Sequence, residues 1–279
     1  MPTISSPGSP SPEIEPHKER AMAESFGIDA ERYDRTRLRY PAALVERIVA
    51  AAPGPDVLDI GSGTGIAARQ FTEAGCRVLG VEPDARMAEF ARRAGIQTEV
   101  ATFEDWDPVG RDFDAAIAAT AWHWIDPIAA AAKAARVLRS GGLLTAFWNV
   151  FQMPPVVLDA FAASYRQAVP DSPIDLRAMA APAADTYDTM IGKATGGIGR
   201  TGAFGEVEHW RFEWEWHYTK ETWLDQMPTS GILTRLPPDR LTPMLDSVGA
   251  AIDRLGGGFT MPYLTMAFAC RRNDAAPTG

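Results

Sequence analysis

The sequence contains little cysteine. Only two cysteines, Cys76 and Cys270, occur among 279 residues, and both stand in apolar stretches. Two cysteines are too few for a disulfide framework or a zinc site. We therefore predict that the chain holds no metal and resides in a reducing compartment, by default the cytoplasm.

Basic residues and long apolar runs are also scarce. The 27 lysines and arginines are outnumbered by 36 aspartates and glutamates, which gives a formal net charge of −9. Because nucleic-acid-binding surfaces are usually basic, this balance argues against a nucleic acid as partner. No apolar run is long enough to span a membrane, and the first residues lack the apolar core of a signal peptide. We expect a monomer or homodimer without membrane partners.

The composition changes along the chain and suggests one domain between two tails. Residues 1–16 are rich in proline and serine, which predicts a disordered tail, and residues 273–279 are expected to form another. Residues 17–272 are then a single domain. Within it, residues 152–203 are rich in alanine, proline and aspartate and contain amphipathic stretches. We expect them to form a helical insertion over the active-site face that acts as a substrate lid.

A glycine-rich turn is the most informative stretch. It reads Val57-Leu58-Asp59-Ile60-Gly61-Ser62-Gly63-Thr64-Gly65 and predicts a buried strand, a sharp turn and the start of a helix. Glycines in such a turn allow positive φ angles and let a ligand approach the main chain closely.

A second strand, predicted at residues 77–82, ends in Glu82. In a doubly wound sheet this carboxylate lies beside the glycine turn, where it can accept both hydroxyls of a ribose. The glycine spacing is G-x-G-x-G, and Ile66 stands where a dinucleotide site has its third glycine. Asp59 also places a negative charge where a pyrophosphate would be repelled. A cationic cofactor without phosphate fits this pattern better than a nicotinamide dinucleotide.

The glycine stretch resembles motif I of the class I methyltransferases that depend on S-adenosylmethionine (SAM), and Val81-Glu82-Pro83-Asp84 resembles their motif II. The resemblance covers roughly residues 17–272. It implies a Rossmann-like α/β fold, a seven-stranded sheet with an antiparallel final hairpin made by residues 204–218 and 259–270. It also implies that SAM is the cofactor and S-adenosylhomocysteine the product. A glycine turn that binds no ligand is the alternative.

Two further segments resemble a bacterial subgroup of this family, methyltransferase type 11. Residues 33–41 are similar to its Y-x-x-x-R-P-x-Y-P segment, with Leu38 in place of the first proline, and residues 121–126 to its A-F-H-W-x-D motif. The resemblance implies that Tyr33 and Arg37 approach the methionine end of SAM, with Arg37 pairing with its carboxylate. An N-terminal helix that merely packs on the sheet is the alternative.

The resemblance also implies a set of cofactor-binding residues. The family places the adenine after the third strand, where Thr102 and Phe103 would contact the base and Glu104 would hold the loop. Phe103 and Met87 could equally belong to the core. The full set is Tyr33, Arg37, Asp59, Gly61, Ser62, Gly63, Glu82, Pro83, Met87, Thr102, Phe103, Glu104 and Thr120.

His123 is the candidate catalytic residue, because it follows the predicted strand 113–120 at its carboxyl end, where open α/β sheets place their catalytic groups. A neutral imidazole there could take a proton from the acceptor, or it could position the loop or the methionine moiety. Both roles remain open. Tyr40, Trp122 and Trp124 are expected to form the wall of the substrate pocket.

The function predicted on this basis is transfer of the sulfonium methyl group of SAM to a small organic acceptor by in-line displacement. Oxygen is our choice of acceptor atom, with carbon and nitrogen as alternatives. A SAM-binding protein without activity and a nicotinamide-dependent oxidoreductase are the competing classes.

Overall fold

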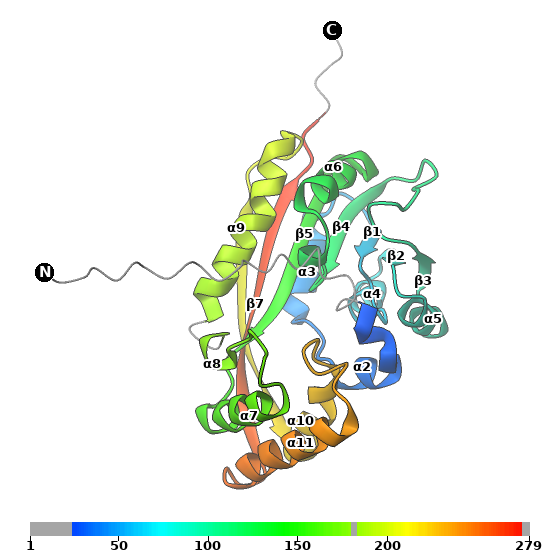
Figure 1. The fold of residues 1–279 in the computed structure, drawn as a ribbon. Coiled ribbons are helices and arrows are strands. Elements are labelled where there is room, and N and C mark those ends of the chain that lie inside the picture. Colours follow the sequence, from blue (N-terminus) through cyan, green and yellow to red (C-terminus); the bar gives the residue numbers. More distant parts are fainter. Residues whose placement is uncertain (1–23, 180–182, 275–279) are drawn as a thin grey trace, which may run out of the picture.

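The computed structural model describes residues 24–179 and 183–274. The predicted tail at 1–16, and all but the first two residues of the predicted tail at 273–279, lie outside the described residues. Figure 1 shows a long twisted sheet with helices on both faces and a group of helices at one end. None of the described helices is both long enough and apolar enough to cross a membrane.

The described residues form one seven-stranded sheet in the order β3-β2-β1-β4-β5-β7-β6. Strands β1 to β5 are parallel, whereas β7 pairs antiparallel with both β5 and β6. This confirms the predicted fold class and its antiparallel end. The strands are β1 Asp56–Ile60, β2 Arg77–Glu82, β3 Gln97–Val100, β4 Phe113–Ala119, β5 Leu138–Phe151, β6 Glu208–Thr219 and β7 Gly258–Arg271.

The helices begin before the sheet and then alternate with its strands. They are η2 Glu24–Asp29, α2 Ala30–Thr36, α3 Ala42–Ala51, α4 Ile66–Glu73, α5 Ala85–Arg93, η3 Trp122–Trp124, α6 Pro127–Val137, α7 Pro155–Ala168, α8 Leu176–Met179, α9 Ala183–Thr201, α10 Lys220–Gln226, η4 Met227–Thr229 and α11 Pro238–Asp253.

Both faces of the central strands are covered, which explains their apolar composition. Strand β4 is at the centre of the sheet and consists largely of small residues. Its Ala115 and Ile117 pack with α3 and α4 on one face, and its Ala116 and Ala118 pack with α6 and α9 on the other. Small side chains allow both helical layers to approach the strand closely.

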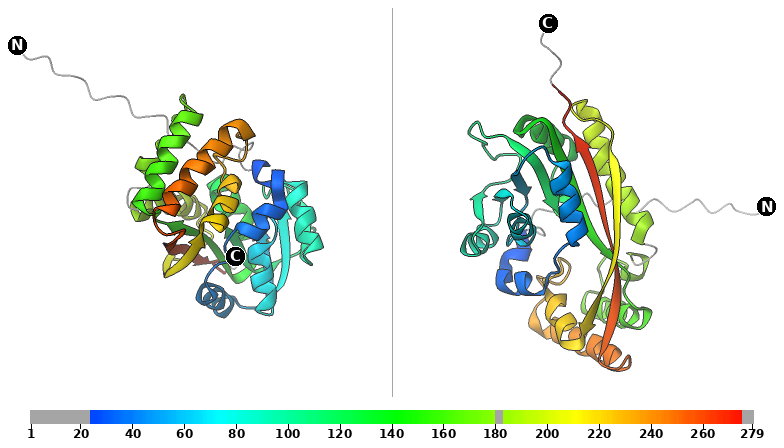
Figure 2. Two further views of the ribbon diagram at one scale, coloured as in Figure 1. Left: turned by 90° about the horizontal axis from the view of Figure 1, so that it is seen from below. Right: turned by 180° about the vertical axis from the view of Figure 1, so that it is seen from behind.

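A third group of helices lies beyond the carboxyl ends of β1 and β4. Strands β5 and β7 are each 14 residues long and extend past their neighbours. Helices α7, α10 and α11 pack against this extension, as Figures 1 and 2 show, and share one apolar cluster with the ends of β6 and β7. The carboxyl ends of the parallel strands therefore face helices α7, α10 and α11, which we call the helical wall.

The predicted insertion at 152–203 is helical, but its two long helices lie in different places. Helix α7 packs against α11 in the helical wall, whereas α9 packs against α6 and β5 on the face of the sheet. Ile191, Ala194 and Ile198 of α9 are buried in the main core. No described residue of this segment lines the two pockets described below.

An ion cluster joins the amino ends of the parallel strands, at the side of the sheet opposite to the helical wall. Arg139 of β5 lies 3.0 Å from the Asp56 carboxylate and 2.8 Å from the carboxylates of Asp112 and Asp114. The Asp114 side chain is only 8% exposed, so its charge depends on this pairing. In contrast, Arg77 reaches Asp56 from a side chain that is 69% exposed.

Replacing Arg139 with methionine is expected to lower the free energy of unfolding by about 2–3 kcal/mol, because the buried Asp114 carboxylate would lose its partner. Arg77→Met is the matched control and should cost less than about 1 kcal/mol, as is usual for an exposed ion pair. Urea unfolding of the two variants and the parent chain measures both values. Equal losses of unfolding free energy in the two variants would show that the burial of Asp114 does not determine how much the ion cluster stabilises the fold.

Candidate functional site

The glycine turn lies at the carboxyl edge of the sheet and is folded against β2. Gly61, Gly63 and Gly65 have φ angles of 67°, 55° and 84°, a region that side chains other than glycine rarely adopt. The N–H groups of Gly61 and Ser62 both donate to the carbonyl of Val81. A Cβ atom on Gly61 would lie 2.6 Å from the Cβ of Ala121. The turn therefore needs glycine for its conformation and for its close packing.

Glu82 ends strand β2 beside this turn. Its Oε2 accepts a hydrogen bond of 2.8 Å from the N–H of Gly63, and its Oε1 accepts one of 2.9 Å from the N–H of Asp84. The residue is 8% exposed, and burial raises the pKa of its carboxyl group to about 7, although the two hydrogen bonds offset part of the rise. The structure thus places Glu82 where the sequence predicts it.

Asp59 lies directly beneath the turn and is completely buried. Neither of its carboxylate oxygens accepts a hydrogen bond of normal geometry. Burial, and secondly the nearby Glu82 charge, raise the pKa of this carboxyl group to about 7. No ion pair among residues 24–179 and 183–274 that the structure describes involves either carboxylate. Two buried acids without a protein cation favour a positively charged ligand at this turn.

A cavity of about 340 Å³ opens over Glu82, and we call it the Glu82 pocket. It brings together most of the predicted cofactor-binding residues, which come from α2, the glycine turn, β2, α5 and the loops after α2, β2, β3 and β4. Its wall includes Tyr33, Arg37, Gly61, Gly63, Glu82, Pro83, Met87, Thr102, Phe103, Glu104, Thr120, His123 and Trp124. Of the predicted set, Ser62 lines the neighbouring pocket instead, and Asp59 lies below the surface of both.

The loop after β3 is held in place by Lys133 of α6, a residue that sequence reasoning missed. The Lys133 ammonium group donates to the carbonyl oxygens of Glu104 and Trp106. It also lies 5.6 Å from the centre of the Phe103 ring. The only signal in the sequence is a single lysine in an alanine-rich helix. Phe103 is 3% exposed and stacks on Trp106, so it belongs to the core and to the pocket wall together.

His123 is held by an indole from the neighbouring strand. The Nε1–H of Trp148, in β5, donates a hydrogen bond of 3.0 Å to Nδ1 of His123. Burial lowers the pKa of this imidazole to about 4, so the ring is neutral near pH 7. Because Nδ1 is the acceptor, the proton of the neutral ring is on Nε2. A ring in this state presents a donor to the pocket, which argues for a positioning role and against a general base.

The two tryptophans beside His123 have different environments. Trp122 is 1% exposed, packs against Phe268 and lines neither pocket. The expectation that it forms part of the substrate pocket is therefore corrected, because the short helix η3 turns this side chain into the core. Trp124 faces the Glu82 pocket, with its ring 6.1 Å from that of Phe26. Sequence reasoning did not single out Phe26 as a pocket residue.

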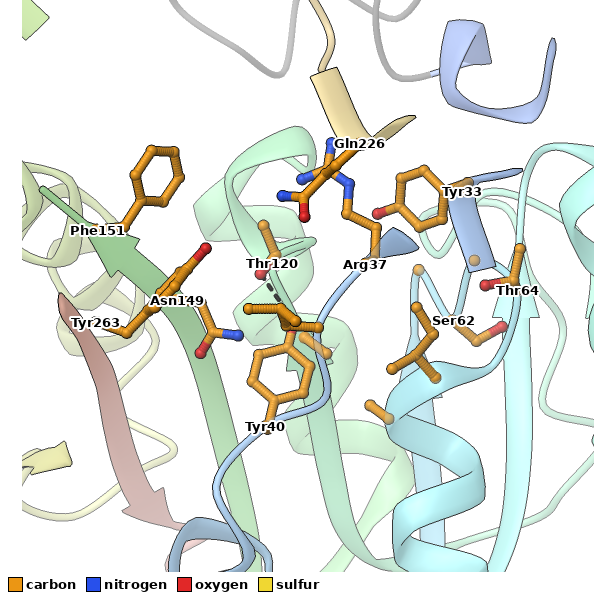
Figure 3. A pocket seen from close by; sticks show the side chains of 16 residues that line it. Tyr33, Arg37, Tyr40, Ser62, Thr64, Thr120, Asn149, Phe151, Gln226 and Tyr263 are labelled. Atoms are coloured by element: carbon orange, nitrogen blue, oxygen red, sulfur yellow. Dashed lines mark hydrogen bonds between the residues drawn. The ribbon is translucent and has the colours of Figure 1, made fainter. Parts of the chain in front are cut away.

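A second cavity, of about 120 Å³, adjoins the first and is shown in Figure 3. We call it the Asn149 pocket. Tyr33, Arg37, Gly61, Gly63, Ala119 and Thr120 line both cavities. Its other walls include Tyr40, as the sequence predicts, and residues that sequence reasoning missed because they come from β5, α10 and β7: Asn149, Phe151, Gln226 and Tyr263.

Two residues at the junction of the pockets are held in unusual arrangements. Thr120 has a φ angle of 55°, and its hydroxyl lies 2.9 Å from that of Tyr40. A non-glycine residue in this region is strained, and such strain is often found at functional sites. Arg37 donates from Nη2 to the carbonyl of Thr229 at 2.6 Å, while its buried Nε has no hydrogen-bond partner.

Comparisons with known proteins agree with this geometry. Residues 58–146 match the family model described as "Methyltransferase domain". An uncharacterised methyltransferase of Mycobacterium tuberculosis and its counterpart in Mycobacterium bovis are 39% identical to this chain over 132 residues, or 47% of the chain and 54% of the relative. The chain thus spans about half the length of the curated relatives it matches.

Two solved structures resemble this chain over most of its length. A protein described as a type II methyltransferase from Anaeromyxobacter dehalogenans has a TM-score of 0.57 at 25% identity, over 85% of this chain and 97% of that one. A phosphoethanolamine N-methyltransferase from Haemonchus contortus, solved with SAM, has a TM-score of 0.50 at 15% identity, over 95% of this chain and 62% of that one. The second likeness is evidence of fold alone.

The buried Asp59 carboxylate is expected to destabilise the ligand-free protein. Because its pKa is raised in the folded state, the folded protein holds a proton that the unfolded chain has released, so stability falls as the pH rises from about 4 through about 7. Asp59→Asn should therefore raise the melting temperature by roughly 2–5 °C at about pH 8, and by less at about pH 5. Thermal unfolding followed by circular dichroism measures both, with the exposed Glu46→Gln as a neutral control. A lower melting temperature for Asp59→Asn at the higher pH would contradict this account.

We also expect the neutral ring of His123 to adopt a single tautomer. Nitrogen-15 NMR should show a neutral ring with its proton on Nε2 from about pH 5.5 upward, because burial and the Trp148 hydrogen bond both disfavour a proton on Nδ1. In Trp148→Phe the Nδ1 atom loses its donor, and both tautomers should be populated. An unchanged spectrum in that variant would mean that Trp148 does not fix the ring.

Proposed function

We propose that this chain, whose residues 58–146 match a methyltransferase-domain family model, moves the sulfonium methyl group of SAM to a small organic acceptor. The observation that carries the proposal is the pair of buried carboxylates, Asp59 and Glu82, beside a glycine turn that lines a cavity of about 340 Å³. A cofactor with a positively charged sulfur and no phosphate matches that charge.

The residues present fit SAM. Glu82 has the position and the free lone pairs to accept ribose hydroxyls. Phe103 offers an apolar surface for a purine, and the Thr102 loop is ordered by the hydrogen bond from the Thr102 hydroxyl to Asp105. Asp59 supplies negative charge beneath the turn, and Arg37, with its unpartnered Nε, suits the methionine carboxylate.

When bound, SAM supplies an already activated methyl group, so the protein's contribution is to position the reactants and exclude water. Phe26 and Trp124 form an apolar wall of the Glu82 pocket, and Arg37 and Tyr33 line its junction with the Asn149 pocket. His123 contributes a fixed N–H donor in the Glu82 pocket. The Asn149 pocket, which begins at this junction, is the proposed place of the acceptor.

Oxygen remains our choice of acceptor atom, with carbon and nitrogen as alternatives. We also propose that the protein works in the cytoplasm as a monomer or homodimer, without metal, nucleic acid or membrane partners. The formal net charge of −9 supports the part of this proposal that concerns nucleic acid. A nicotinamide oxidoreductase is the weaker candidate, because Asp59 would repel a pyrophosphate and Ile66 stands where a dinucleotide site has its third glycine. A SAM-binding protein without activity differs only in turnover.

Calorimetric titration of the full chain should show binding of SAM and S-adenosylhomocysteine and none of NAD. Glu82→Gln keeps a hydrogen-bond acceptor but removes the charge, and we expect it to weaken SAM binding by about tenfold or more. Glu46→Gln serves as the control and should bind like the parent. Failure of both SAM and S-adenosylhomocysteine to bind would reject the proposal.

SAM binding should also release protons. The pKa values of Asp59 and Glu82 are raised to about 7 in the free protein, and a cationic ligand stabilises their ionised forms and lowers both values. Affinity should therefore rise between about pH 6 and about pH 8. Titrations in two buffers of different ionisation enthalpy, at about pH 6.5, measure the proton release. Proton uptake, or none, would contradict the roles given to these carboxylates.

A further inference from the structure

The amide of Asn149 is oriented by a chain of hydrogen bonds that begins on the edge strand. The indole N–H of Trp214, in β6, donates to the hydroxyl of Thr265 at 2.8 Å. That hydroxyl then donates to Oδ1 of Asn149 at 2.7 Å. Because Thr265 has one hydroxyl proton and is completely buried, the chain has one direction. The carbonyl of Asn149 is thereby occupied, and its NH₂ group remains for the Asn149 pocket.

Gln226, in helix α10, is oriented in the same way by the hydroxyl groups of two tyrosines in β6 and β7. The hydroxyl of Tyr218 donates to Oε1 of Gln226 at 3.0 Å, and the Tyr263 hydroxyl lies 2.7 Å from that of Tyr218. Since Tyr218 has used its proton, Tyr263 is the donor of this pair. Gln226 therefore presents its NH₂ group to the pocket. Two amides from separate elements, and the guanidinium of Arg37, therefore present oriented donors beside the hydroxyl groups that also line this wall.

The pocket also lacks a group that could remove a proton. No aspartate, glutamate, histidine or lysine is among the described residues that line it. Burial raises the pKa of Tyr40 well above its usual value. In the adjoining pocket, the Nδ1 atom of His123 is occupied by Trp148. An alcohol, a phenol or an ammonium group would have to lose a proton on methylation, and this wall offers nothing to accept it.

We propose that the acceptor is a small carboxylate and that the product is its methyl ester. The proposal rests on the proposed function and names the substrate class of the same site. A carboxylate oxygen is already ionised near pH 7, so its lone pair forms the new C–O bond directly. The C–S bond of SAM breaks, its electron pair stays on sulfur, and neutral S-adenosylhomocysteine leaves. No proton is transferred, and no further reactant is required.

The shape of the pocket matches this class. Asn149 and Gln226 offer amide N–H donors to a carboxylate, and the aromatic rings of Tyr40, Phe151 and Tyr263 offer an apolar surface to a flat tail. An amine would meet these amide and guanidinium donors, which cannot accept its hydrogen bonds, so its binding is disfavoured.

Binding of defined probes tests the proposal on the full chain saturated with S-adenosylhomocysteine. Benzoate and cinnamate are expected to bind at least about tenfold more tightly than benzamide and benzylamine, because only an anionic carboxylate forms charge-assisted hydrogen bonds with the oriented amide donors. Gln226→Glu should weaken benzoate binding by about tenfold or more, since it places a negative charge beside the ligand. The same substitution at the exposed Gln152 is the matched control and should leave binding unchanged.

Turnover provides the second test. With SAM labelled in its methyl group, the carboxylate probes should yield products whose label is released as methanol by mild alkali, the signature of a methyl ester. Faster transfer to benzylamine or benzyl alcohol, which gives alkali-stable products, would overturn the proposal. So would equal binding of benzoate, benzamide and benzylamine. Loss of S-adenosylhomocysteine binding would instead reject the proposed function, so the two failures are distinguishable.

Discussion

The burial of two carboxylates beside one glycine turn is the constraint on which the site depends. Asp59 and Glu82 lie at the ends of adjacent parallel strands, where the described part of the chain supplies two main-chain N–H donors to Glu82 and no full positive charge to either carboxylate. Such an arrangement raises both pKa values and weakens the ligand-free fold. It is tolerated because the sheet is tied elsewhere, notably by the Arg139 cluster at its opposite edge.

The polarity of the site changes from one pocket to the next. The Glu82 pocket is acidic and suits a cationic cofactor. The Asn149 pocket has amide and guanidinium donors and no described acid, so it suits an anionic acceptor. Opposite polarity in adjoining cavities brings a cation and an anion together with little electrostatic penalty, and it keeps each reactant out of the other's place.

Local sequence patterns predicted the structural features that depend on residues close together in the sequence. The glycine spacing and the acid at the end of β2 located the turn and Glu82. Most of the other residues of the Glu82 pocket, and the antiparallel end of the sheet, were implied by the family resemblance. Patterns failed to predict which way neighbouring side chains point. The side chain of Trp122 enters the core, whereas that of Trp124, two residues later, faces the Glu82 pocket. They also failed for partners far apart in sequence: Trp148 fixes His123, and Asn149, Gln226 and Tyr263 meet only because three elements converge.

The chain from Trp214 through Thr265 to Asn149 joins the outer strand of the sheet to the inside of a pocket. Trp214 also stacks on Tyr263, with ring centres 4.5 Å apart. The chemical preference of the pocket is therefore partly set by a residue that touches no reactant. Divergence among relatives, or directed evolution in the laboratory, can retune which molecules are accepted by altering β6 alone, so surveys restricted to cavity-lining positions would overlook such changes.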